Sequence, residues 1–298
     1  MELNQLNSAT NLALDGVTRP RSTTTTGVGP ATKGKLKIQR FVVPYRVYGA
    51  AAHTLVFVNG VQQSMAMWHS FVRRFKATYR IVLFDLPNQG GGQVVRGSAH
   101  LSLEEQVDIL TAVIEATNAT DPLTVCSASW GGVIAMAYAV RYPQRIRSLI
   151  LASMGTRANQ KMIDMISQGL QNPVKDPLKV AESLIEGIGQ DLPVAMKNKI
   201  VSQFQHMGPE AFQAFLQHGS TVLSVRELSK VVDVSKVRCQ TILLHGENDT
   251  IVDLDDVRYL AAEIPRSELR VIENVGHFLH LEKEELLDVY EEILASLP

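Results

Sequence analysis

Residue 129 is a serine in a segment whose composition suits a nucleophile. The segment LTVCSASWGG, residues 123–132, runs from an apolar stretch through small residues into an alanine-rich stretch. A buried strand that turns sharply into a helix can hold a serine with its hydroxyl above the sheet, in the pattern G-x-S-x-G, if the residues two before and two after it are small. Gly131 meets that requirement, and Ser127 stands where glycine is usual. The alternative is that Ser129 only caps the following helix.

Two residues near the end of the chain could activate this serine. A serine hydroxyl is a poor nucleophile until a base takes its proton. His277, in VGHFLH, follows the apolar stretch 269–272, and Asp249, in HGEND, follows the apolar stretch 241–244. Open α/β sheets place their sites at the carboxyl ends of the strands, where all three residues would meet. The order and placement predict a triad with His277 as the base and Asp249 as the acid that orients it. The alternative is that both are ordinary polar loop residues.

Other carboxylates lie close to the predicted acid. They are Glu247, Asp253, Asp255 and Asp256. The last three fit the first turn of a helix, where the helix dipole favours negative charge. They are therefore weaker candidates. A second histidine, His280, is expected inside the following helix as a surface or core residue.

Two backbone N–H groups are needed to bind the oxyanion that forms when a serine attacks an acyl group. One is expected from Trp130, the residue after the nucleophile. The other is expected from Val61, in the turn Asn59-Gly60-Val61 after the apolar stretch 54–58. An ordinary Asn-Gly turn has the same backbone, so only the donor role separates the two interpretations.

Short apolar stretches alternate with helical patterns along most of the chain. Stretches rich in valine, isoleucine and leucine, without alternation, are typical of strands buried on both faces. They occupy 54–58, 80–84, 123–126, 148–151, 241–244 and 269–272, and the segments 36–43 and 45–48 suggest an initial hairpin. Helical patterns occupy 103–117, 131–141, 254–264 and 282–297. This alternation predicts an α/β fold with a mostly parallel sheet and helices on both faces.

Residues 158–228 break the alternation, because they contain only helical patterns. These patterns occupy 161–170, 178–188, 193–206 and 209–218. We interpret the segment as a helical lid inserted into an α/β core of residues 36–157 and 229–298. Its many apolar side chains either pack onto the core or line an apolar ligand pocket. Residues 1–35, rich in Ser, Thr, Asn and Gly, are expected to form a disordered tail.

Composition excludes several classes of protein. The chain has 298 residues with 29 Lys and Arg against 30 Asp and Glu, and this balance argues against a nucleic-acid-binding protein. Its two cysteines, Cys126 and Cys239, cannot form a disulfide framework, and no cluster of His, Asp and Glu has metal-ligand spacing. No apolar run reaches the roughly 18 residues of a membrane span. The glycine run 90–92 is expected to be a structural turn, because a lone glycine cluster is a weak phosphate signal.

Most of the chain resembles the family of 3-hydroxyacyl-carrier-protein acyltransferases. That family contains the synthase of 3-(3-hydroxyalkanoyloxy)alkanoic acids, the lipid precursor of rhamnolipids. It also contains the 3-hydroxyacyl-ACP:CoA transacylase, or thioesterase, that feeds polyhydroxyalkanoate synthesis. The matching segments are VNG at 58–60, IVLFDLP at 81–87, SASWGG at 127–132, QHM at 205–207 and GHFLHLE at 276–282. The Asn-Gly pair and the Ser-x-Ser-Trp-Gly-Gly motif depart from ordinary hydrolases, which makes them more specific than the triad.

The resemblance implies the α/β-hydrolase fold, with the nucleophile, acid and base at Ser129, Asp249 and His277. It also implies substrate contacts at Asn59, Gly60, His206 and Met207. The chain departs from the family in its N-terminal tail. It departs again at residues 248–251, where the family has an acidic and an aromatic residue after the acid. The second departure could alter the choice of acyl chain or acceptor.

The implied reaction transfers a 3-hydroxyacyl group from a thioester of acyl carrier protein (ACP) or CoA to a 3-hydroxy fatty acid, CoA or water. It needs no metal or other cofactor and is expected in the cytoplasm. An acidic carrier protein would need a local basic patch. The candidates are Arg73, Arg74 and Lys76, or Arg141, Arg145 and Arg147. Two alternatives stay open, namely a carboxylic-ester or thioester hydrolase and a non-catalytic ligand-binding protein on the same fold.

Overall fold

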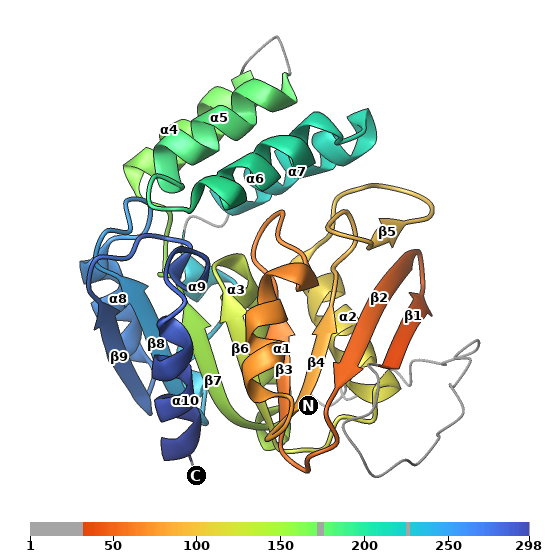
Figure 1. Cartoon of the computed structure of the whole chain (residues 1–298), viewed down its shortest axis with the longest axis vertical. Coiled ribbons are helices and arrows are strands. Elements are labelled where there is room, and N and C mark those ends of the chain that lie inside the picture. Colours follow the sequence, from red (N-terminus) through yellow and green to blue (C-terminus); the bar gives the residue numbers. More distant parts are fainter. Residues whose placement is uncertain (1–31, 172–175, 225–226, 298) are drawn as a thin grey trace, which may run out of the picture.

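One sheet organises the molecule (Figure 1). The computed structural model describes residues 32–171, 176–224 and 227–297. The sheet has nine strands in the order β1-β2-β4-β3-β6-β7-β8-β9, with β5 beside β2. The strands are β1 (Thr32–Ile38), β2 (Phe41–Tyr48), β3 (Thr54–Val58), β4 (Arg80–Phe84), β5 (Gln93–Val94), β6 (Leu123–Ala128), β7 (Ile146–Ala152), β8 (Gln240–Gly246) and β9 (Ser267–Ile272). The strands from β4 to β9 in this order pair in parallel, so the predicted mostly parallel sheet is confirmed.

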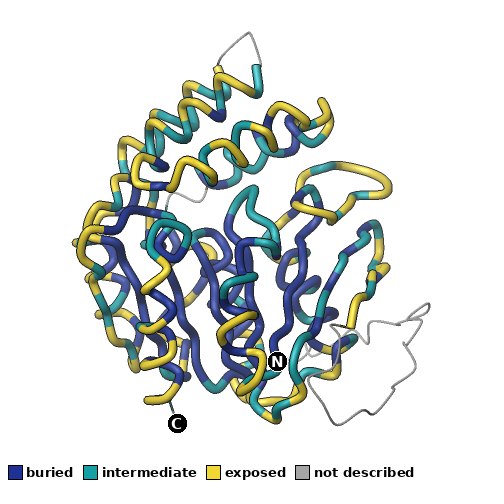
Figure 2. The backbone as a smooth tube through the Cα atoms, in the orientation of Figure 1, coloured by how far each residue is buried: buried dark blue, intermediate teal, exposed yellow. Residues whose placement is uncertain are grey.

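Helices cover both faces of the sheet. They are α1 (His69–Phe75), α2 (Leu103–Ala116), α3 (Trp130–Arg141), α8 (Leu254–Glu263), α9 (Leu279–Glu282) and α10 (Leu286–Ser296). One apolar cluster joins the sheet to α1 and α10, and another joins its opposite face to α2, α3 and α8. Every residue of β3 and β6 is buried, and Figure 2 shows these central strands as continuous dark blue tubes. Burial on both faces explains why these strands are unbroken apolar stretches in the sequence.

The N-terminal hairpin differs from its prediction in two places. The chain reverses at Gln39 and Arg40, between β1 and β2, because Gln39 adopts the left-handed φ of 50° that a tight turn needs. Pro44, expected between the two strands, lies inside β2 opposite Lys35. The predicted tail is also too long, because β1 begins at Thr32, which pairs with Val47. The rest of the predicted tail, residues 1–31, lies outside the described residues.

Four helices interrupt the alternation between β7 and β8. They are α4 (Gln160–Gln171), α5 (Pro177–Ile188), α6 (Val194–Gln205) and α7 (Pro209–Ser224). Figure 1 shows them as a separate layer above the sheet, and they share a small apolar cluster of their own that includes Phe204, Phe212 and Leu216. We call residues 158–228 the helical insertion; its action as a lid stays a prediction. Among the described helices, none is both long and apolar enough to cross a membrane.

Candidate active site

Ser129 occupies a sharp turn between β6 and α3. Its backbone has φ 49° and ψ −123°, which is a strained conformation for a residue with a side chain. The turn is fixed on both sides, because the Ser129 N–H donates to the Ala152 carbonyl at 2.8 Å and the Ser129 carbonyl accepts from the Gly132 N–H at 2.8 Å. The side chain makes no cap hydrogen bond to the helix, which argues against the helix-cap alternative. This conformation is the one expected of a nucleophile elbow.

Gly131 allows β3 to approach this turn. A Cβ atom at residue 131 would lie 2.5 Å from the Val58 carbonyl oxygen and 2.7 Å from the Asn59 carbonyl oxygen. We expect Gly131→Ala to lower the free energy of unfolding by about 2–3 kcal/mol, because the backbone must move to admit the methyl group. Urea denaturation checks this. Gly169→Ala is the matched control, because a Cβ there meets nothing within 4 Å; equal losses in the two variants would contradict the prediction.

His277 and Asp249 form a buried pair. The His277 Nδ1 lies 2.8 Å from Asp249 Oδ2, and the other Asp249 oxygen accepts from the N–H groups of Ile251 at 3.0 Å and Val252 at 3.1 Å. Burial alone would lower the pKa of His277, but the charge and hydrogen bond of Asp249 outweigh burial and raise it. Burial would raise the pKa of Asp249, but His277 and the hydrogen bonds hold that pKa below its ordinary value. Asp249 is thus ionised, and the Nδ1 bond leaves Nε2 of His277 to accept a proton.

Two residues that sequence reasoning missed hold the histidine loop. The Glu282 carboxylate accepts from the Gly276 N–H at 2.5 Å and from the Phe278 N–H at 2.9 Å, on either side of His277. The Ser153 hydroxyl donates to the His277 carbonyl at 2.6 Å. The helix predicted over residues 282–297 begins later than expected, because α10 starts at Leu286 and Glu282 ends the separate short helix α9. Its carboxylate therefore positions the histidine rather than facing solvent.

The predicted nucleophile, base and oxyanion residues lie around one cavity. Its volume is about 80 Å³, and its walls include Ser129, His277, Val61 and Trp130. Among the described residues, Ser129 Oγ and His277 form no direct hydrogen bond, which is common in active sites without substrate. The structure thus brings together the residues that the sequence placed far apart, at the carboxyl ends of β3, β6 and β9.

A second, larger cavity lies within the helical insertion. Its volume is about 210 Å³ and most of its walls are apolar, from α4, α5 and α7. Val61, Met162 and Val222 line this cavity and also the cavity at Ser129. We call it the insertion cavity. The shared walls place an apolar space directly beside the nucleophile.

The side chain of Asn59, a predicted substrate contact, is used inside the protein. It is buried, its amide nitrogen donates to the Phe84 carbonyl at 3.0 Å, and its oxygen accepts from Trp68 Nε1 at 2.8 Å. The Gly60 N–H donates to Gln63 Oε1 at 2.7 Å. These bonds fix the loop that carries Val61, so both residues act on the site through that loop.

The other two predicted substrate contacts lie away from both cavities. His206 is exposed at the end of α6, where its Nδ1 lies 2.8 Å from the Ser202 carbonyl oxygen. Met207 packs against the apolar cluster of the insertion that contains Phe204. Neither residue lines the cavity at Ser129 or the insertion cavity. In this arrangement the motif QHM belongs to the packing of α6 and α7.

The rival titratable groups have structural partners. Asp256 is buried and accepts from the Thr156 N–H at 2.6 Å, which ties the loop after β7 to α8. His280 is a core residue stacked on Trp68 with ring centroids 4.6 Å apart, and burial lowers its pKa to about 3. Within the described ranges, no group of three or more His, Cys, Asp and Glu side chains could hold a metal ion.

Comparison with known proteins identifies the family of the chain. The sequence profile of the Alpha/beta hydrolase family matches residues 55–289. The chain is 26% identical over 249 residues to the (R)-3-hydroxydecanoyl-ACP:CoA transacylase of Pseudomonas putida, covering 80% of this chain and 83% of that protein. It is 22% identical over 261 residues to a 2-hydroxy-6-oxononadienedioate/2-hydroxy-6-oxononatrienedioate hydrolase of the same species, covering 80% and 87%. The transacylase match confirms the resemblance inferred from the motifs.

Solved structures share the fold. The α/β hydrolase MGS-M2, from a Medee basin deep-sea metagenome library, matches with a TM-score of 0.78 at 18% identity, over 89% of this chain and 98% of its own. A thermophilic esterase from Thermogutta terrifontis matches with a TM-score of 0.73 at 20% identity, over 90% and 99%. The chain therefore belongs to the alpha/beta hydrolase family and is an enzyme of its serine-type hydrolase and acyltransferase class.

Proposed function

We propose that the protein is an acyltransferase that moves 3-hydroxyacyl groups. The donor is a thioester of ACP or CoA, and the acceptor is a 3-hydroxy fatty acid or CoA. The observation that carries this proposal is the insertion cavity beside Ser129, because it offers apolar walls to an acyl chain whose carbonyl reaches the nucleophile. The name of the relative in Pseudomonas putida supports the choice of donor. Such donors and acceptors place the reaction in the cytoplasm.

The mechanism begins with proton transfer to His277. Its Nε2 takes the proton of the Ser129 hydroxyl, while the ionised Asp249 stabilises the imidazolium. Ser129 Oγ attacks the thioester carbonyl, and the N–H groups of Val61 and Trp130 bind the oxyanion. The thiolate leaves with a proton from His277, and an ester on Ser129 remains. His277 then deprotonates the acceptor, whose attack releases the product and restores the serine.

The helical insertion would favour transfer over hydrolysis. Each methylene group of the acyl chain that it buries contributes about 0.8 kcal/mol to binding. A bound chain of medium length would therefore exclude water from the insertion cavity. The family departure after Asp249 lies where this insertion meets the core. Thr250 donates to the Gly187 carbonyl at 3.0 Å and accepts from Lys161 Nζ at 2.9 Å. A change at Thr250 would therefore move α4 and α5, which line the insertion cavity.

Three donors separate the proposal from its main alternative. Purified protein is offered a 3-hydroxydecanoyl-ACP thioester, the matching CoA thioester and a p-nitrophenyl ester, and kcat/KM is compared. An acyltransferase should prefer a hydroxyacyl thioester over the ester. A simple carboxylic-ester hydrolase should show the reverse order, and that order would reject the proposal.

A basic cluster around His69 suits an acidic carrier protein. The pKa of His69 is lowered chiefly by burial and further by three nearby positive charges. These belong to Arg46 of β2, Arg73 of α1 and Lys199 of α6. None of the three cations forms an ion pair with another described residue. Three of the other candidates form ion pairs within the protein. Arg141 pairs with acidic residues of α2, Arg145 pairs with one acidic residue of α2 and with Asp121, and Arg74 pairs with acidic residues of α10.

We therefore expect Arg73→Glu to weaken carrier binding. KM for the ACP thioester should rise about three- to ten-fold at low salt and less at high salt, because exposed charges are screened. Activity on a p-nitrophenyl ester should not change. Arg258→Glu is the control, because Arg258 lies on α8 on the opposite face of the sheet. An equal rise in KM in both variants would count against this docking surface.

A further inference from the structure

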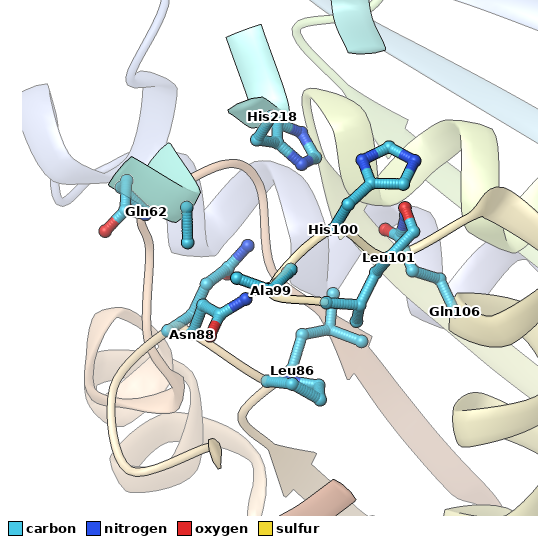
Figure 3. Close-up of a pocket in the computed structure, with 11 residues that line it drawn as sticks. Gln62, Leu86, Asn88, Ala99, His100, Leu101, Gln106 and His218 are labelled. Carbon is cyan, nitrogen blue, oxygen red and sulfur yellow. Dashed lines mark hydrogen bonds between the residues drawn. The ribbon is translucent and has the colours of Figure 1, made fainter. Parts of the chain in front are cut away.

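His218 lies where the two ligand spaces meet. It extends from α7 and lines the insertion cavity beside Val61. Its ring also lines a small polar pocket, in which Figure 3 shows it opposite the loop that carries Asn88 and His100. His218 packs edge-to-face against Trp130, with ring centroids 5.1 Å apart and an interplanar angle of 85°. The imidazole is therefore next to the residue that follows the nucleophile.

One ring nitrogen of His218 is not used within the described protein. Its Nε2 is buried and has no hydrogen-bond partner there. Burial lowers the pKa of His218 to about 4, so the ring is neutral near pH 7 and carries one N–H donor and one acceptor nitrogen. A buried polar atom without a partner is costly in a native protein. The geometry thus leaves His218 ready to bond a group that the substrate brings.

The small polar pocket matches a single hydroxyl group. Its volume is about 20 Å³, close to the space that one water molecule needs. Gln62 and Gln106 also line it. Gln62 follows Val61 in the chain, and Gln106 Oε1 accepts from Trp130 Nε1 at 2.9 Å. Each predicted oxyanion residue is therefore a direct neighbour of a residue that lines this pocket.

We infer that His218 recognises the 3-hydroxyl group of the acyl donor. This inference rests on the proposed function. With the carbonyl at Ser129 and the alkyl chain in the insertion cavity, the hydroxyl lies two carbons from the reacting carbon and so close to the oxyanion residues. A ring nitrogen of His218 at the border of the polar pocket then bonds the hydroxyl, while an acyl chain without it leaves that nitrogen unpaired. His218 is thus a specificity-determining residue.

The test compares a hydroxylated and a plain donor. The p-nitrophenyl esters of 3-hydroxydecanoate and decanoate are used with wild type and His218→Phe, which keeps an aromatic ring against Trp130 and removes both nitrogens. We expect kcat/KM for the hydroxylated ester to fall about 10- to 100-fold and that for decanoate to stay within about two-fold. His218→Gln, which retains a donor and an acceptor, should restore part of the preference.

The matched control is Phe215→Leu, in the apolar wall of the same cavity. It should lower kcat/KM for both esters by the same factor. Equal losses on the two esters in His218→Phe, or no loss on either, would overturn the inference. The outcome is independent of the carrier and of the acceptor, because both probes are simple esters. If thioesters fail while these esters react, the proposed acyl transfer fails and the role of His218 is still decided.

Discussion

Replacement of Ser129 by alanine is expected to lower kcat on every thioester and ester substrate by on the order of 10⁶-fold. In the proposed mechanism Ser129 Oγ forms the covalent intermediate, and the other two hydroxyls in the walls of that cavity already have partners, since Ser153 donates to the His277 carbonyl and Thr156 donates to Asp256. The residual rate would come from substrate binding and the oxyanion N–H groups. Steady-state rates with a p-nitrophenyl ester give the measurement, and thermal unfolding confirms that the variant is folded.

Ser127→Ala is the control for this substitution. Ser127 lies two residues away in β6, and its hydroxyl is buried with no hydrogen-bond partner among the described residues. Removing that hydroxyl should leave the rate within about two-fold of wild type, because alanine also satisfies the small-residue requirement of the elbow. A Ser129→Ala protein that retains activity would rule out the nucleophile. A wild-type protein inactive on all substrates would favour the ligand-binding alternative.

Asp249→Asn is expected to lower kcat about 10⁴-fold. The amide fills the same space, but it no longer carries the charge that stabilises the imidazolium of His277. The pH profile adds a second readout. The base must be neutral, so activity rises with pH through the pKa of His277, which Asp249 raises against the opposing effect of burial. Without the carboxylate, burial lowers that pKa, and the rising limb of the residual activity should move to lower pH.

Asp253→Asn is the control for the acid. Asp253 is a neighbouring exposed carboxylate that accepts from Asn159 Nδ2 at 2.9 Å. Its replacement should leave both the rate and the pH profile close to wild type. If Asp253→Asn lost as much activity as Asp249→Asn, the acid would be wrongly assigned. An unchanged acid limb in Asp249→Asn would contradict the coupling between the buried pair.

The sequence was sufficient to predict the sheet, and it placed the three proposed catalytic residues just after strands of that sheet, because both inferences depend on local patterns. The central strands are buried on both faces and are therefore unbroken apolar stretches, as in β3. Ser129, Asp249 and His277 each follow such a stretch, and the hydrogen bond between Asp249 and His277 places two of them together. The hairpin turn was misplaced because proline is a common turn residue. Gln39, where the chain turns, adopts a positive φ that is uncommon for glutamine.

What could not be predicted depends on contacts between distant segments. Glu282 resembled an ordinary first residue of a helix, and only the fold shows its carboxylate against the Gly276 N–H. His218 was expected at the end of a helix, but α7 continues to Ser224 and presents its ring to Trp130. The side chain of Asn59 was expected at the substrate, but Trp68 and the Phe84 carbonyl occupy its polar atoms. None of these pairings leaves a pattern in the local sequence.

The most direct test of acyl transfer is the fate of the acyl group. Purified protein is mixed with 3-hydroxydecanoyl-ACP and either CoA or 3-hydroxydecanoic acid, and the products are separated and identified by mass spectrometry. We predict 3-hydroxydecanoyl-CoA in the first mixture or the ester-linked dimer of the acid in the second, formed faster than free acid is released. Free 3-hydroxydecanoic acid as the sole product in both mixtures would contradict acyl transfer and leave a thioester hydrolase.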